Sequence, residues 1–145
     1  MKIIRVAFVI AALVGVFTAQ ATFATHWTSV TQVDKSVSQN CVGGTKIDSP
    51  VSGTAYPVSF DGSAGTIPFT IVSTAAGDTL SFMTDDPSHQ VDSIIVKGGP
   101  TYGLLYTYAG GTYSDTGLHA VRNASSGKWY GVSHVCVYNT HKKSL

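Results

Sequence analysis

The stretch Val91–Tyr108 constrains the fold of this chain most strongly. Its first part, Val91–Val96, is a nearly continuous apolar run, as a central β-strand requires. Lys97-Gly98-Gly99 follows as a turn, and a second run rich in Tyr and Leu comes after it. The stretch therefore predicts two neighbouring strands, joined by a glycine turn, around which the rest of a sheet packs.

Three segments upstream alternate apolar and polar residues with a period of two. They are Thr54–Phe60, Thr66–Val72 and Thr79–Met83, joined by short Gly/Asp turns, which predicts an antiparallel meander. Pro57 cannot donate to a β-ladder, so its strand is expected at a sheet edge. With a last strand over Tyr130–Tyr138, roughly seven or eight strands favour an all-β, antiparallel two-sheet β-sandwich of Greek-key or immunoglobulin-like type. A small open barrel is the alternative, and no helix is expected.

The first residues have the layout of a secretory signal peptide. Lys2 and Arg5 precede the apolar run Val6–Phe17, and small residues then allow cleavage after Ala21 or Ala24. We expect a signal peptide over residues 1–24 and a secreted, extracellular protein with no membrane contact after cleavage. An uncleaved anchor is the alternative, although the run is short for a membrane span.

The remaining chain divides into a polar arm or first strand over residues 25–40, a sandwich domain over 41–140 and a tail over 141–145. Cys41 and Cys136 bracket the domain. Because exported chains meet oxidising conditions, we expect them to form a disulfide. Closing a loop of roughly a hundred residues contributes about 4–5 kcal/mol in the chain-entropy model. Two buried free thiols are the competing interpretation.

The charge balance argues against a nucleic-acid partner. Nine Lys and Arg, less the two in the leader, leave seven basic side chains against eight Asp, and the chain has no Glu. The basic residues are scattered and form no stripe that could follow a phosphate backbone.

An ordered set of short motifs spans the chain from about Asn40 to Tyr138. In order they are Thr45-Lys46-Ile47-Asp48, Gly53-Thr54-Ala55-Tyr56, Val96-Lys97-Gly98-Gly99, Tyr106-Thr107-Tyr108, Asp115-Thr116-Gly117-Leu118-His119 and Ser133-His134 followed by Cys136 and Tyr138. This set resembles a module of secreted and surface-attached microbial proteins. Counted from Tyr138, the cysteine stands one place earlier than in that module. The resemblance implies a secreted β-sandwich and no particular chemistry.

Serine, histidine and aspartate are all present, so a hydrolase triad can be proposed. Its members would be Ser133 or Ser114, His134 or His119, and Asp115 or Asp92. The chain lacks a Gly-x-Ser-x-Gly elbow, and neighbouring strand residues point to opposite faces, which prevents attack geometry between Ser133 and His134. We therefore expect no enzyme, with a secreted hydrolase using His134 and Asp115 as the alternative. The simpler expectation is that His134 packs and bonds a loop carbonyl or Asp115.

We expect no cofactor. The spacing of His119, His134 and Asp115 matches no familiar zinc site. Calcium is the alternative, held by Asp85, Asp86 and Asp92, whose oxygens are ligands that this ion prefers. That arrangement would make the chain a calcium-dependent carbohydrate-binding module, although it lacks an Asp-x-Asp-x-Asp-Gly loop. Otherwise, the first two acids form a solvated turn.

Lys97 stands between an apolar strand and two glycines. We expect an ion pair with Asp92 or Asp115 that fixes the neighbouring loop; anchoring a ligand or forming a covalent crosslink are the alternatives. Gly98 and Gly99 are expected to supply positive φ in the turn. Lys97, the two glycines and the Asp115, His119 and His134 positions thus form a structural motif.

A long polar loop is expected over Gly110–Trp129, and aromatic residues in and near it are the best binding candidates. Tyrosine and tryptophan combine an apolar ring with a polar group and are enriched in contact surfaces. The candidates are Tyr102, Tyr113, Trp129 and Tyr130. Core packing would explain Tyr106 or Tyr108, but not both if a single buried layer exists.

These observations predict a secreted, non-catalytic β-sandwich that acts by binding or assembly at a cell surface or in the extracellular matrix. The partner would be an extracellular protein or glycan. Alternatively, the arm over residues 25–40 adds a strand to a neighbouring copy, so that the chain becomes a subunit of a filament. Asn123-Ala124-Ser125 is a glycosylation sequon that a eukaryotic secretory pathway would use.

Overall fold

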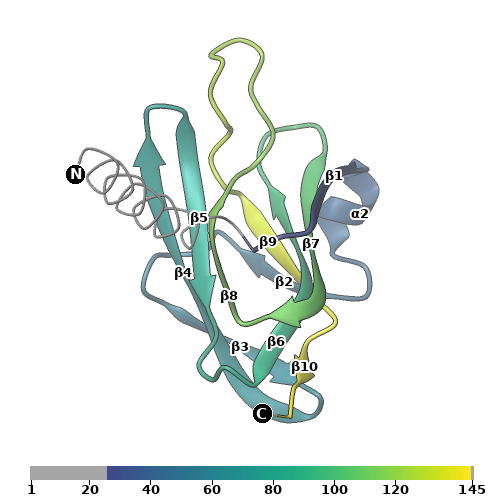
Figure 1. Cartoon of the computed structure of the whole chain (residues 1–145). Coiled ribbons are helices and arrows are strands. Elements are labelled where there is room, and N and C mark those ends of the chain that lie inside the picture. The colour runs from purple at the N-terminus through teal and green to yellow at the C-terminus, as the bar shows by residue number, and fades with distance from the viewer. Residues whose placement is uncertain (1–25, 145) are drawn as a thin grey trace, which may run out of the picture.

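The computed structural model describes residues 26–144, so the expected signal peptide lies outside the described residues. The chain forms two antiparallel sheets packed face to face (Figure 1). In the first sheet the strand order is β1 (Ser29–Val33), β7 (Gly103–Thr112), β6 (His89–Lys97), β9 (His134–Tyr138) and β2 (Thr45–Asp48), and β10 (His141–Lys142) also pairs with β6. In the second, the order is β3 (Ala55–Phe60), β4 (Ser63–Thr74), β5 (Gly77–Met83) and β8 (Ser114–Leu118). The predicted two-sheet fold is confirmed.

The apolar run and its return strand form the centre of the first sheet. Strand β6 pairs with β7 on one side and with β9 on the other, so that Val96 lies opposite both Leu104 and Val135. Ile94 and Val96 are fully buried because both flanks of the strand are paired and its inner face meets the second sheet. The central hairpin is confirmed.

The predicted meander forms the second sheet. Strands β3, β4 and β5 follow one another as antiparallel neighbours, and the apolar members of each alternation point inward. Strand β3 lies at the edge of this sheet. Pro57 therefore stands where a missing backbone donor costs least, as expected.

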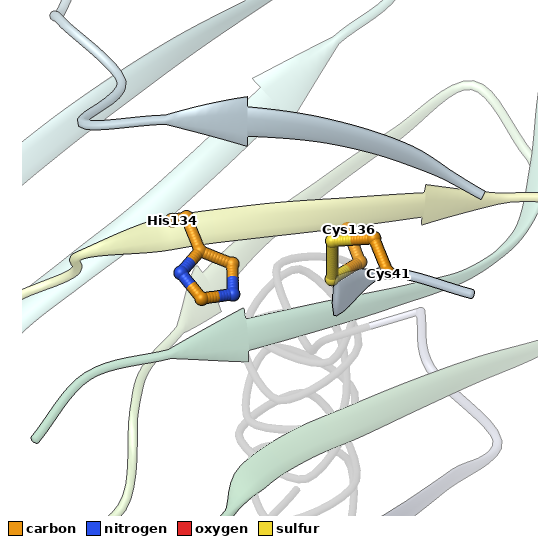
Figure 2. A group of neighbouring side chains, drawn as sticks. All are labelled: Cys41, His134 and Cys136. Atoms are coloured by element: carbon orange, nitrogen blue, oxygen red, sulfur yellow. A yellow bond between two sulfur atoms is a disulfide. The ribbon is translucent and has the colours of Figure 1, made fainter. Parts of the chain in front are cut away.

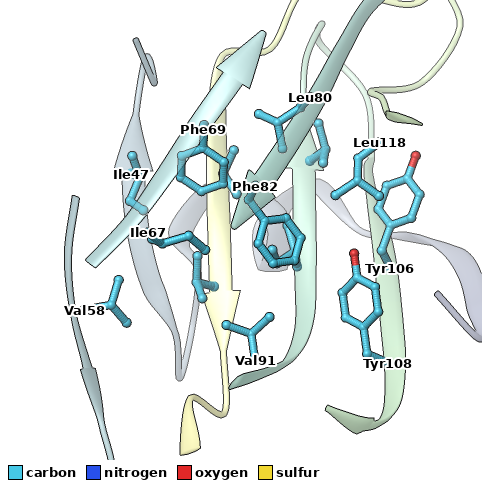
Figure 3. Close-up of a cluster of buried hydrophobic side chains, with 14 of the residues drawn as sticks. Ile47, Val58, Ile67, Phe69, Leu80, Phe82, Val91, Tyr106, Tyr108 and Leu118 are labelled. Atoms are coloured by element: carbon cyan, nitrogen blue, oxygen red, sulfur yellow. The ribbon is translucent and has the colours of Figure 1, made fainter. Parts of the chain in front are cut away.

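The core lies between the two sheets (Figure 3). It takes side chains from both inner faces, among them Phe69 and Phe82 from the second sheet. Tyr106 and Tyr108 are both 2 % exposed and both belong to this core. The expectation that only one of them is buried was wrong, because alternate residues of β7 share the inner face of the first sheet and reach different parts of one continuous core.

A short helix, α2 (Lys35–Asn40), covers part of the outer face of the first sheet. The expectation of no helix was wrong. Six residues are too few to show a periodic apolar stripe, and the helix depends on tertiary contacts. Cys41 ends it in the left-handed conformation, φ 50°, and is joined by a disulfide to Cys136 on β9. The predicted disulfide is confirmed, and it fixes the helix to the sheet.

The segment expected as one long loop contains regular structure. Strand β7 continues to Thr112, and β8 then pairs with β5 through a register shift between Leu80 and Phe82. The sequence of β8 is polar, so it shows no pattern that predicts a strand. Of its residues, only Asp115 and Leu118 are buried. The remaining irregular segment runs over residues 119–133. At the other end of the chain, part of the expected tail forms β10.

The polar arm forms β1 and pairs with β7 of its own sheet over Ser29–Val33. Trp27, just before the strand, packs edge-on against Tyr106 at 6.1 Å between ring centroids. Within residues 26–144, no helix has the length and apolar character needed to cross a membrane.

Candidate functional site

One end of the sandwich gathers three connections (Figure 1): the β4–β5 turn, the β6–β7 turn and the segment over residues 119–133. Three of the four aromatic binding candidates lie on these connections, namely Tyr102, Trp129 and Tyr130. We call these three residues the aromatic end. The fourth, Tyr113, lies between β7 and β8 at the opposite end of the sandwich, and its carbonyl accepts a hydrogen bond from the Thr84 amide.

Trp129 is held in place by ring stacking and backbone bonds. Its indole stacks on the imidazole of His119, with 3.8 Å between centroids and 7° between planes. Its backbone amide donates to the carbonyl of Ala76 in the β4–β5 turn at 2.8 Å. Trp129 is half-buried and does not belong to the core cluster. The side chain is therefore ordered without being needed to fill the interior.

The other two residues of the aromatic end, Tyr130 and Tyr102, differ in how much of their side chains is exposed to solvent. Tyr130 is half-buried and packs against the core, whereas 44 % of Tyr102 is exposed. Tyr113 is exposed to a similar degree, 39 %, at the far end of the molecule. Three of the predicted binding residues therefore lie on connections at one end of the sandwich, and the fourth lies at the other end.

The ring of Tyr130 explains one of the two glycines in the β6–β7 turn. Gly99 has φ +72°, and a Cβ there would lie 2.5 Å from that ring. Gly98 is required for a different reason, because a Cβ would lie 2.2 Å from the carbonyl oxygen of Gly131. The prediction of positive φ is confirmed for Gly99 and was wrong for Gly98, where close backbone packing demands the missing side chain.

Lys97 does not form the predicted ion pair. Its ammonium donates to the carbonyl of Gly99, and no carboxylate of the described chain lies within 4 Å of it. Asp115 and Asp92 pair instead with His26 and His141. The prediction was wrong because Lys97 lies at the end of β6 towards the outer side of the first sheet, away from both carboxylates.

Burial and a neighbouring charge both lower the pKa of the Lys97 ammonium. The residue is 4 % exposed, and burial lowers the pKa of its ammonium, with a further lowering of the pKa from the charge of Lys35. Lys97 and His134 form the floor of a pocket of about 250 Å³, and the other lining residues are Lys35, Gln39, Lys46, Gly99, Pro100 and Ser133. We call this the lysine pocket. No acidic side chain lines it.

His134 and Asp115 lie on different sides of the first sheet. Val135 and Val137 of β9 point into the core, so His134 and Cys136 point outward towards α2. Figure 2 shows the His134 ring and the disulfide projecting from the same side of the strand. The ring Nε2 donates to the carbonyl of Ser38 in α2. The expected bond to a carbonyl is present, although a helix supplies it rather than a loop.

Asp115 is 1 % exposed and faces the interior from β8. Its Oδ1 accepts hydrogen bonds from the amides of Thr116 at 2.8 Å and His26 at 3.1 Å, and the His26 ring lies 3.6 Å away. The carboxylate thus holds the beginning of the arm.

The expectation that Ser133 and His134 point to opposite strand faces was wrong, because Ser133 precedes β9 and its hydroxyl oxygen lies 3.5 Å from His134 Nδ1. Asp115 and Asp92 instead pair with His26 and His141, so the candidate triad is not assembled among the described residues.

His119 likewise has a structural setting. Its ring Nδ1 donates to the carbonyl of Ala120 at 2.9 Å, and its backbone amide donates to the hydroxyl of Tyr106, also at 2.9 Å. Burial raises the pKa of Tyr106 to about 12. The pKa of Tyr108 is also raised, first by burial and then by the neighbouring Asp115 charge.

The three carboxylates considered for calcium serve different partners. Asp85 accepts from the His89 ring at 2.7 Å, and Asp86 accepts from the amide and hydroxyl of Ser88. These bonds hold the pKa of each carboxyl below its usual value. Asp92 lies 3.2 Å from the His141 ring. The structure does not bring the three together.

One group of three side chains that could ligate a metal occurs among residues 26–144: Cys41, His134 and Cys136 (Figure 2). The two sulfurs are bonded to each other, so the group offers a single nitrogen and does not form a metal site in this state.

The sequon residue Asn123 lies in a tight turn of the 119–133 segment. Its side-chain oxygen accepts from the amide of Ser125, and its carbonyl accepts from the amide of Gly127. Ala124 and Ser125 are exposed.

Sequence reasoning missed the partners that surround Lys97. Lys35 comes from α2 and Lys46 from β2, and both are far from Lys97 in the chain. In β2, Ile47 points into the core, so its neighbour Lys46 must point to the outer face of the sheet. This alternation is the one feature of the sequence that indicates where the Lys46 side chain points.

The fold and these contacts define a two-sheet β-sandwich with one disulfide among its described residues, an aromatic end, and a lysine pocket beside the β6–β7 turn. Comparison with protein-family models, curated proteins and solved structures finds no match to this chain.

Proposed function

We propose that this protein is a secreted, non-catalytic binding module that contacts a cell-surface or matrix glycan through its aromatic end. The observation that carries the proposal is the fixed position of Trp129, which stacks on His119 outside the core. A ring that is already ordered loses little conformational entropy when a ligand covers it.

The other two residues of the aromatic end, Tyr102 and Tyr130, would supply further rings to the same ligand. Tyr102 is among the most exposed aromatic residues of the described chain, and it lies on the β6–β7 turn whose Gly99 packs under the ring of Tyr130. Aromatic rings that combine an apolar face with a polar edge suit sugars, which present C–H groups and hydroxyls together. A non-catalytic role fits the separation of Asp115 from His134.

The test is a printed glycan array probed with the secreted chain and with Trp129→Ala. The proposal expects a defined set of glycans to retain the wild-type protein and to lose the variant. Equal retention of both proteins, or no retained glycan at all, would reject a glycan-binding aromatic end. Circular dichroism of the variant checks that the sandwich is still folded.

A further inference from the structure

The lysine pocket lies on the outer side of the first sheet and presents an unbalanced buried charge. The ammonium of Lys97 has three donor hydrogens, and its one protein acceptor among the described residues is the carbonyl of Gly99. A buried ammonium is unfavourable unless it is paired with an anion or well hydrogen-bonded. Among residues 26–144, no carboxylate lies within 4 Å of the Lys97 ammonium.

The surroundings increase the positive potential instead of neutralising it. Lys35 of α2 is close enough for its charge to act on Lys97. Lys46 of β2 reaches the same pocket, and its own partner, Asp48, lies 3.5 Å away with a side chain 72 % exposed. An exposed pair of this kind is weak, so Lys46 can turn towards a ligand at little cost.

The pocket is held by elements that are fixed relative to one another. The disulfide joins the end of α2 to β9, and the His134 ring donates to a carbonyl of the same helix. The Ser133 hydroxyl, which also lines the pocket, donates to the carbonyl of Lys97 at 3.0 Å. The three lysines therefore converge on one space of about 250 Å³ without any rearrangement of the backbone.

We propose that the lysine pocket binds an oxyanion, that is, a carboxylate, sulfate or phosphate group, with Lys97 at its floor and Lys35 and Lys46 at its rim. Such a group would accept charge-assisted hydrogen bonds from Lys97 and relieve the repulsion between the lysines. This site goes beyond the proposed function, because the lysines that would hold the anion are not part of the aromatic end and variants of the two sites are tested separately.

The test follows the backbone amide signals of Gly99 and Ser133 by NMR while sodium sulfate, phosphate, acetate or glucuronate replaces sodium chloride at constant ionic strength. Amide shifts are preferred to melting temperature because sulfate stabilises most folded proteins through exclusion from their surface. We expect saturable shifts confined to the lysine pocket. Tighter binding of glucuronate than of acetate would identify an acidic sugar as the source, whereas tightest binding of sulfate or phosphate would identify a free inorganic ion.

Three variants complete the experiment. Lys97→Met should abolish the saturable amide shifts. Lys35→Met should weaken the apparent affinity for the anion by about tenfold, the effect of losing one charged contact. Lys128→Met, an exposed lysine of the 119–133 segment, is the matched control and should behave as wild type. Lys35 is also exposed, so its variant keeps the test valid if Lys97→Met does not fold. Shifts that do not saturate, or that persist in both pocket variants, would overturn the proposal.

Discussion

The imidazole of His119 and the indole of Trp129 lie face to face, 3.8 Å between centroids and 7° from parallel. The contact joins the two ends of the segment over residues 119–133, and backbone bonds from Trp129 connect that segment to the β4–β5 turn. Trp129 is therefore held by its ring within the 119–133 segment and by its backbone to the β4–β5 turn, which fixes its position at this end of the sandwich.

Removing His119 should loosen Trp129 without unfolding the sandwich. In a Trp27→Phe background, Trp129 is the only tryptophan of the chain. Introducing His119→Ala there should shift its fluorescence emission to the red and increase acrylamide quenching, because one face of the indole becomes solvated. Tyr102→Ala in the same background is the control. An unchanged emission in His119→Ala would show that backbone bonds alone fix the tryptophan.

Loss of the disulfide should destabilise the whole fold. Cys41 and Cys136 are 95 positions apart, so the crosslink removes much conformational entropy from the unfolded chain. The double variant Cys41→Ser/Cys136→Ser should lose about 2–5 kcal/mol in the free energy of unfolding, measured by denaturant titration. A loss of unfolding free energy below about 1 kcal/mol would indicate that packing holds α2 in place without the disulfide.

The β6–β7 turn should reject a side chain at Gly98. A Cβ there would lie 2.2 Å from the backbone oxygen of Gly131, which cannot move without distorting the neighbouring strand. Gly98→Ala should therefore cost about 1–3 kcal/mol or more in the free energy of unfolding. Gly131→Ala is the matched control, because its nearest contact, at 3.5 Å to Asp78, is ordinary; its effect should stay within about 0.5 kcal/mol. Equal losses would contradict the close-packing explanation.

Alkaline pH should unfold the protein through its core tyrosines. The pKa of Tyr106 rises from an ordinary value near 10 to about 12 on folding, and the pKa of Tyr108 is raised in the same direction. Since the folded state holds these protons more tightly, their contribution to stability is complete below about pH 10 and falls as pH rises towards 12. Absorbance at the tyrosinate band should show these residues ionising together with the loss of near-ultraviolet circular dichroism. Tyr106→Phe should lower the pH dependence of stability in this range, and an unchanged dependence would argue against the assignment.

The features that the sequence predicts well are those set by neighbouring residues. The apolar run before Gly98, the alternation of β4 and the position of Pro57 each reflect a local requirement, and each is confirmed. Helix α2 could not be predicted because a disulfide and sheet packing hold it, rather than its own six residues. Strand β8 was hidden because its two buried residues, Asp115 and Leu118, are three positions apart and one of them is a carboxylate.

The candidate site was predictable only in part for the same reason. Trp129, Tyr130 and Tyr102 were recognisable by residue type, but the position of Tyr113 depends on how far β7 continues. The partners of Lys97 were not visible, because Lys35 and Lys46 approach it only through the docking of α2 and the pairing of β2 with β9.

The most direct test of the central claim compares two tyrosines at opposite ends of the sandwich. Tyr102 and Tyr113 are similarly exposed, so Tyr102→Ala and Tyr113→Ala remove the same side chain from comparable surroundings. Isothermal titration calorimetry with the glycan most strongly retained on the array supplies the dissociation constants. The account predicts that Tyr102→Ala weakens binding about tenfold or more, equivalent to about 1.4 kcal/mol, while Tyr113→Ala binds as wild type. Equal affinities for the two variants, or a loss confined to Tyr113→Ala, would contradict binding through the aromatic end.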